Sequence, residues 1–209
     1  FTLAEIVVAR VSGQRYCDFL RENITDPIGA SSTRTIENRN PENPLVHEKK
    51  KPAELLLVEG AGGLTTTMID LCKFGQLFLT ENPVLSEVSK QEMAKKQGVS
   101  FLPQDQKSLA YGLGWDTVDF RDPDFDLGEG VLRKGGNSFQ FTSQLIVIPK
   151  YNAVLAISET HDCKIDVTQA ALHIFAQWLL DKQGISIYRR SQAIPPVVSG
   201  NCCGTYLMP

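Results

Sequence analysis

An apolar run meets a cation and two glycines in Val131-Leu132-Arg133-Lys134-Gly135-Gly136-Asn137-Ser138. A hairpin follows: the pattern predicts apolar strands over residues 143–148 and 153–158, joined by the turn Pro149-Lys150-Tyr151-Asn152. Because glycine has no Cβ, two adjacent glycines at a strand end let backbone approach a ligand closely. The segment therefore predicts a sheet whose first strand ends beside a positive charge and open space.

Helical patterns lie on both sides of this hairpin. Residues 1–12 carry an apolar stripe of Leu3, Ile6, Val7 and Val11, and Gly13 separates them from a second helical segment. Further helices are predicted over about residues 67–79 and 86–96, with Thr67 and Ser86 as N-caps. The predicted fold is therefore α/β, more precisely mixed α+β: an antiparallel sheet flanked by helices.

The last predicted helix spans about residues 166–182. Its stripe of Val167, Ala171, Ile174 and Trp178, with Phe175 and Leu179 beside it, is expected to cover the sheet. His173 is expected at the flank of this helix without a catalytic role. Residues 119–129 are rich in acidic side chains. They are predicted to form a solvent-exposed, hairpin-like loop near the mouth of a cleft at the sheet.

Two further segments precede Lys134-Gly135-Gly136 in a fixed order. The first is Gly60-Ala61-Gly62-Gly63-Leu64-Thr65-Thr66-Thr67-Met68-Ile69-Asp70-Leu71, in which Thr67 and Asp70 fit a capping box. The second is Tyr111-Gly112-Leu113-Gly114-Trp115, expected to form a strand. In this order the three segments resemble motifs of the serine β-lactamase, penicillin-binding protein and related esterase family.

The resemblance implies a site and a chemistry. Lys134, Gly135 and Gly136 match the family's Lys-Thr-Gly-like motif, which lines the catalytic cleft, and a glycine stands where many members have Thr or Ser. Asn137 and Ser138 are the expected substrate-binding residues. The implied activity is acyl-enzyme chemistry on a β-lactam, a D-alanyl peptide or a simple ester, with no cofactor and no metal.

The family's nucleophile motif, Ser-x-x-Lys, is missing from the sequence. No serine has lysine three residues later: Ser12 is followed by Arg15, for example, and Ser138 by Phe141. No Tyr-x-Asn motif is present either. We therefore expect a C-terminal portion of a hydrolase domain over residues 1–184, inactive alone, and a linker with the start of a small β-domain over residues 185–209.

Two alternatives stay open. One is a catalytically inactive homologue that acts as a binding or sensor module, and the other is a D-stereospecific aminopeptidase of the same fold. In the family two N-terminal strands pair beside the strand that corresponds to residues 153–158. Expected partners are thus a small-molecule or peptide substrate, and the missing N-terminal half of the domain or another chain at this exposed edge.

Composition excludes several other functions. A net charge of -3 and a pI near 5.7 do not favour nucleic-acid binding, which needs a basic face. No apolar run approaches the roughly 20 residues of a membrane span. The five cysteines lack zinc-ligand spacing, and Cys17 and Cys72 are expected to be buried thiols on helices. Family members are often exported, but the sequence leaves the compartment open.

Overall fold

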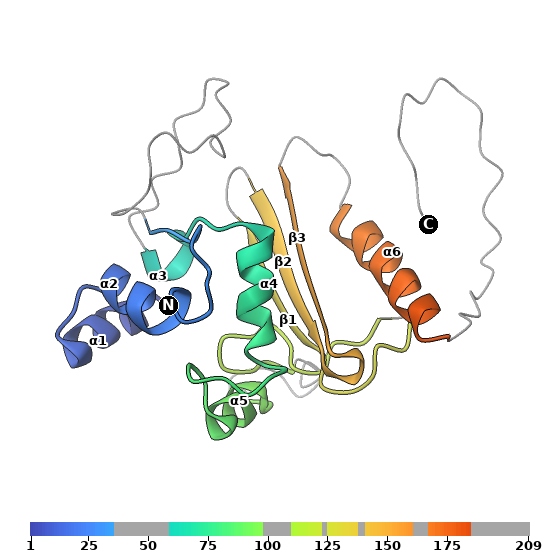
Figure 1. Ribbon diagram of the computed structural model, residues 1–209, viewed down its shortest axis with the longest axis horizontal. Coiled ribbons are helices and arrows are strands. Elements are labelled where there is room, and N and C mark those ends of the chain that lie inside the picture. The colour runs from blue at the N-terminus through green and yellow to red at the C-terminus, as the bar shows by residue number, and fades with distance from the viewer. Residues whose placement is uncertain (36–58, 98–109, 123–124, 138–140, 161–166, 185–209) are drawn as a thin grey trace, which may run out of the picture.

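A three-stranded sheet with helices on both faces forms the centre of the molecule (Figure 1). The computed structural model describes residues 1–35, 59–97, 110–122, 125–137, 141–160 and 167–184. The predicted segment 185–209 therefore lies outside the described residues, and its boundary stays a prediction.

The described helices follow the order that the sequence predicts. They are α1 (Thr2–Ser12), α2 (Tyr16–Leu20), the π-helical turn η1 (Arg21–Thr25), α3 (Glu59–Gly62), α4 (Met68–Gln76), α5 (Glu87–Ala94) and α6 (Val167–Lys182). Both predicted caps are confirmed: the Thr67 side chain accepts the N–H of Asp70 at 3.2 Å, and that of Ser86 accepts the N–H of Ser89 at 3.2 Å. None of the described helices has the length and apolar character that crossing a bilayer requires.

The sheet contains β1 (Leu132–Asn137), β2 (Phe141–Ile148) and β3 (Ala153–Thr160) in the order β1-β2-β3. Both pairings are antiparallel, and Lys134 of β1 lies opposite Leu145 of β2. The predicted hairpin and fold class are thus confirmed. The turn is a 3-10 turn over Pro149–Tyr151 followed by Asn152 in the left-handed region, with φ 48°.

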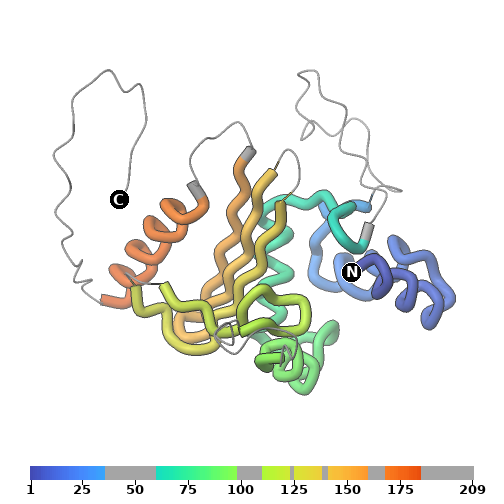
Figure 2. Tube along the Cα trace, turned by 180° about the vertical axis from the view of Figure 1, so that it is seen from behind, coloured from blue at the N-terminus to red at the C-terminus, as the bar shows by residue number. Residues whose placement is uncertain are grey.

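Side chains of β2 are buried on both faces of the sheet, because alternate residues point to opposite sides. Leu145 and Val147 pack into the core under α4, whereas Ile146 and Ile148 pack into the core under α6. Figures 1 and 2 show α4 and α6 on opposite faces of the sheet. The two helices thus shield the central strand from water on both sides.

A buried carboxylate anchors the start of α4. Asp70 accepts the N–H of Ser32 at 2.7 Å and the ammonium of Lys73 at 3.2 Å. The N-cap half of the predicted capping box is present, while the Asp70 carboxylate binds the segment after η1. A charged side chain at this depth is stabilised by several hydrogen bonds to the ionised form.

The predicted sheet-facing stripe of α6 is wrong. Ile174 and Trp178 are 73% and 53% exposed, whereas Leu179 is buried and Phe175 packs against the core, as expected for the residues beside the stripe. The other buried residues of this helix are Thr168, Leu172, Ala176 and Leu180. Apolar residues occupy most of the α6 circumference, so helical spacing alone permits several sheet-facing stripes. The hydroxyl of Thr168 can be buried because Gln144 Nε2 donates to it at 2.9 Å.

The acidic segment also differs from its prediction. Phe125 and Leu127 are buried in the core under α6, on the opposite face from α4, and the Asp122 carboxylate accepts Gln169 Nε2 at 3.2 Å. Burial of these apolar side chains favours this path of the segment. The Asp122 side chain is buried with them, whereas Asp119 and Asp126 stay exposed.

Residues 111–115 do not form the predicted strand. Gly114 has φ 81°, and the chain bends at Leu113 and Gly114 so that the N–H of Gly112 donates to the carbonyl of Trp115; we call this bend the turn before β1. Beside β1 the following residues form an isolated antiparallel bridge, Thr117 to Arg133, rather than a described strand. The apolar stripe of α1 is likewise exposed at Leu3, Ile6, Val7 and Val11 among the described residues.

Helix α4 approaches β3 closely at Gly75. A Cβ at this position would lie 2.5 Å from Val154 Cγ1 and 3.2 Å from Leu145 Cδ1. We expect Gly75→Ala to lower the free energy of unfolding by about 1–3 kcal/mol, even though alanine favours helix, because the added methyl overpacks the core. Urea denaturation measures the free energy of unfolding of both Gly75→Ala and the control variant Gln76→Ala, which changes an exposed neighbour on the same helix. Equal stability of the two variants would contradict close packing at Gly75.

Candidate functional site

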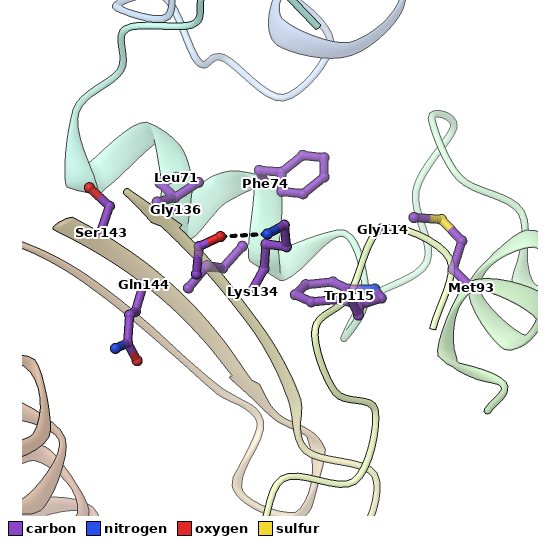
Figure 3. Close-up of a pocket in the computed structure, with 11 residues that line it drawn as sticks. Leu71, Phe74, Met93, Gly114, Trp115, Lys134, Gly136, Ser143 and Gln144 are labelled. Atoms are coloured by element: carbon purple, nitrogen blue, oxygen red, sulfur yellow. Dashed lines mark hydrogen bonds between the residues drawn. The ribbon is translucent and has the colours of Figure 1, made fainter. Parts of the chain in front are cut away.

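A pocket of about 280 Å³ lies between the end of β1, helix α4 and the turn before β1 (Figure 3). Its lining residues come from these elements and from α5 and β2: Leu71, Phe74, Met93, Gly114, Trp115, Lys134, Gly135, Gly136, Ser143, Gln144 and Leu145. Most of the wall is apolar. Small-molecule sites commonly combine an apolar wall with a few polar groups.

Lys134 is the charged residue among those that line this pocket. Leu132, two residues earlier on the same strand, packs into the core under α4, so Lys134 points to the α4 face as well. Arg133 points the other way: its guanidinium lies 4.8 Å from the ring centre of Phe120 and donates to Gln144 Oε1 at 2.9 Å. The strand therefore presents one of its two adjacent cations to the pocket.

Asp116 holds the Lys134 ammonium. Lys134 Nζ lies 2.9 Å from Asp116 Oδ1 and donates to the carbonyl of Gly135 at 2.5 Å, the contact drawn as a dashed line in Figure 3. The other oxygen of Asp116, Oδ2, accepts the N–H of Gly135 at 2.7 Å. One carboxylate thus engages both the cation and the strand backbone.

Sequence reasoning missed Asp116, although it directly follows the Tyr-Gly-Leu-Gly-Trp segment. Its N–H donates to the carbonyl of Arg133 at 3.0 Å, which aligns the turn with β1. An acidic residue next to a motif is the one available signal. The pairing of residues 116 and 117 with β1, which brings Asp116 to Lys134, depends on tertiary contacts and cannot be read from the local sequence.

The two glycines differ in their surroundings. A Cβ on Gly135 would lie 3.4 Å from Asp116 Oδ2, whereas a Cβ on Gly136 would meet nothing within 4 Å. Gly136 and Asn137 are exposed at the end of β1, and Ser138 lies outside the described residues. Gly136 therefore leaves the pocket mouth open, as the sequence predicts for paired glycines.

The outer edge of β1 carries backbone donors in a regular series. Arg133 N–H donates outward to Thr117 at 2.9 Å, and Gly135 N–H donates outward to Asp116. Alternate N–H groups of a strand point the same way, so the N–H of Asn137 also points to this edge. The N–H of Asn137 is therefore the next donor after that of Gly135 on the outer edge of β1, and it lies at the end of this strand.

Two buried groups lie near or opposite the pocket. The indole N–H of Trp115 is buried and has no hydrogen-bond partner among the described residues. His173 packs on the α6 face, where its Nε2 lies 3.5 Å from Asp122 Oδ2 and 2.9 Å from Gln169 Nε2. His173 thus joins α6 to the acidic segment, away from Lys134.

The described residues contain no cluster of His, Cys, Asp and Glu able to hold a metal ion.

Comparison of the sequence with known families identifies the family to which this fold and these motifs belong. The sequence profile of the β-lactamase family matches residues 1–166. The chain belongs to the β-lactamase family. A comparison with curated proteins found no match.

Solved structures share the fold. The β-lactamase/D-alanine carboxypeptidase from Yersinia pestis, complexed with citrate, is 21% identical with a TM-score of 0.61, covering 86% of this chain and 53% of that one. Simvastatin synthase from Aspergillus terreus is 14% identical with a TM-score of 0.63, covering 88% and 53%. The D-amino acid amidase from Ochrobactrum anthropi SV3, complexed with L-phenylalanine amide, is 15% identical with a TM-score of 0.53, covering 87% and 55%.

At such low identities the likeness establishes the fold alone. The chain spans about half the length of these solved chains. Activity, substrates and partners of a whole protein of this fold are therefore matters for proposal.

Cys72 of α4 is next to the pocket residue Leu71, and its ionisation decides whether it can react. Burial raises the pKa of the Cys72 thiol, and a backbone hydrogen bond with Ala156 opposes this effect more weakly. The thiolate is the reactive form, so a raised pKa lowers its fraction at neutral pH. Cys72 is a poor nucleophile under those conditions.

We expect iodoacetamide to alkylate Cys72 more slowly in the folded chain than in urea, with the folded pH-rate profile displaced to higher pH. Peptide-resolved mass spectrometry over a pH series measures both rates for the same residue, so the unfolded chain is its own control. A folded profile displaced to lower pH would show an activated thiol instead.

Proposed function

We propose that this chain is part of a β-lactamase-related serine hydrolase that performs acyl-enzyme chemistry on a β-lactam, a D-alanyl peptide or an ester. The observation that supports the proposal is the position of Lys134. It lies within β1, opposite Leu145 of β2, lines the pocket and precedes two glycines in the order that the family uses. Family membership and the fold agree with this assignment.

Each group at the end of β1 has a proposed role in acyl transfer. The N–H of Asn137, at the strand edge, donates to the oxygen that becomes negatively charged when a nucleophile adds to the acyl carbonyl. Lys134 supplies positive potential that favours this anion and the deprotonated forms of nearby bases. The open side of Gly136 leaves room for the acyl group, and Ser138 is a further proposed donor to substrate.

The nucleophile and its base belong, in this proposal, to sequence outside the 209 residues. The serine oxygen bonds to the carbonyl carbon as its proton passes to the base, and the leaving group departs with a proton. Water then cleaves the acyl ester by the reverse proton transfers. The 209-residue chain alone would not carry out these steps, because it contains no Ser-x-x-Lys motif.

The second candidate is a binding or sensor module without catalysis. The binding module is favoured if the full-length protein, like these 209 residues, contains neither a Ser-x-x-Lys motif nor a Tyr-x-Asn motif. Incubation of the full-length protein with a fluorophosphonate probe, followed by intact-mass spectrometry, separates the two candidates. A stoichiometric adduct on a serine outside these residues supports the hydrolase, and no adduct supports the module.

Lys134 gives the sharpest test of the catalytic proposal. In the full-length protein we expect Lys134→Ala to lower kcat/KM by about 30- to 1,000-fold while thermal stability changes little, because a charge-assisted contact to the developing anion is lost. Lys134→Arg should rescue only partly, since a planar guanidinium has a different reach.

Two controls belong to this test. Lys150, 41% exposed, is a matched lysine because it also pairs with a carboxylate, Asp126, at 2.9 Å, but it lies at the hairpin turn. Arg133→Ala removes the cation on the opposite face. Activity losses in Lys150→Ala or Arg133→Ala as large as in Lys134→Ala would exclude a special role for Lys134.

The outer edge of β3 is the proposed partner surface. It bears no strand among the described residues, whereas the edge of β1 is bridged by Thr117. An apolar strand with unpaired backbone groups pairs readily with another strand. We propose that the N-terminal half of a complete domain, or a second chain, pairs here.

We therefore expect the 209-residue chain to associate through β3 in sedimentation velocity. Ser158→Lys places a charge on the exposed part of this edge strand and should shift the chain toward monomer, because lysine on an edge opposes pairing. Gln76→Lys on the exposed side of α4 is the charge-matched control. A stable wild-type monomer at high concentration would contradict the proposal.

A further inference from the structure

The pocket already contains a carboxylate contact on its cation. Asp116 Oδ1 lies 2.9 Å from Lys134 Nζ, and Asp116 Oδ2 accepts the N–H of Gly135 at 2.7 Å. A substrate carboxylate that approached Lys134 would seek the same two donors, one ammonium and one strand N–H. Asp116, which lies beside the pocket and is not one of its lining residues, thus makes the contacts that an anionic ligand group would make with these two donors.

The charge balance of the pocket follows from this pair. Lys134 is the charged residue among the lining residues, and Asp116 compensates it. The rest of the wall is mainly apolar, and Figure 3 shows Phe74 and Trp115 beside Lys134, with Met93 beyond Trp115. An anion that entered would lose water, meet the negative Asp116 and find its cation already paired.

We propose that Asp116 is a specificity-determining residue that makes this pocket select uncharged acyl groups, esters or amides without a carboxylate at the site of Lys134. The inference rests on the proposed acyl-transfer site and narrows its substrate class. Lys134, held by Asp116, then keeps its contact with the Gly135 carbonyl and remains beside the outward N–H groups of β1.

The substitution Asp116→Asn isolates the charge. An asparagine oxygen can still accept the N–H of Gly135, so the turn stays attached to β1, but the partner of Lys134 becomes neutral. Asp119→Asn is the matched control: it removes the same charge three residues later, where Asp119 pairs with Arg121 at 2.7 Å. Both variants change the net charge equally.

Binding of a matched ligand pair tests the proposal. Phenylacetamide and phenylacetate have the same shape and differ in charge. Their binding is followed by the fluorescence of Trp115 in a Trp178→Phe background, because the sequence contains two tryptophans and Trp178 is the exposed one. The 209-residue chain is suitable in any association state, since the β1 end lies at the other edge of the sheet from β3.

We expect the Trp178→Phe protein with Asp116 intact to bind phenylacetamide more tightly than phenylacetate. Asp116→Asn should tighten phenylacetate binding by about 3- to 10-fold, a gain that high salt weakens, and leave phenylacetamide within about twofold. Asp119→Asn should leave the preference unchanged. Adding Lys134→Met to Asp116→Asn should abolish the gain.

Three outcomes would overturn the proposal: wild-type preference for phenylacetate, equal shifts in the Asp116 and Asp119 variants, or no binding of phenylacetamide. The measurement requires no acyl transfer. Failure of the hydrolase proposal would appear as a full-length protein without a serine adduct, whereas failure of this inference would appear as the wrong ligand preference.

Discussion

The two-sided burial of β2 is the constraint on which the rest of the structure depends. Leu145, Ile146, Val147 and Ile148 are consecutive and all buried, so both faces of the sheet need an apolar cover. Helix α4 covers one face and α6 the other. Once α4 is fixed against the sheet, its side chains Leu71 and Phe74 meet the end of β1. The pocket is therefore a product of the same packing that stabilises the domain.

Local signals in the sequence predicted the elements of this arrangement well. The hairpin was predictable because apolar runs flank a turn rich in turn-forming residues, and Thr67 and Ser86 were predictable caps because capping depends on residues within one helical turn. The motif around Lys134 was also local. Its residues do line a pocket, while their catalytic role stays a prediction.

Predictions that depended on tertiary contacts were less successful. Helix α6 is apolar around most of its surface, so periodicity selected Ile174 and Trp178 although the sheet contacts Leu172 and Ala176. The many acidic residues of segment 119–129 predicted exposure to solvent, although Phe125 within it is buried. Asp116 was not recognised at all, because its importance comes from an ion pair with Lys134, 18 positions later in sequence, which the neighbouring bridge of Thr117 to Arg133 brings close.

The bridge between Thr117 and Arg133 also makes the two edges of the sheet unequal. The chain's own turn occupies backbone groups at the β1 edge, while β3 carries no such cover among the described residues. Two copies joined β3 to β3 would form an isologous pair whose outer strands are both β1. Further growth by edge pairing would have to use the outer edge of β1, where the N–H groups of Arg133 and Gly135 are already bonded to Thr117 and Asp116. The turn that carries Asp116 would thus limit the size of any assembly.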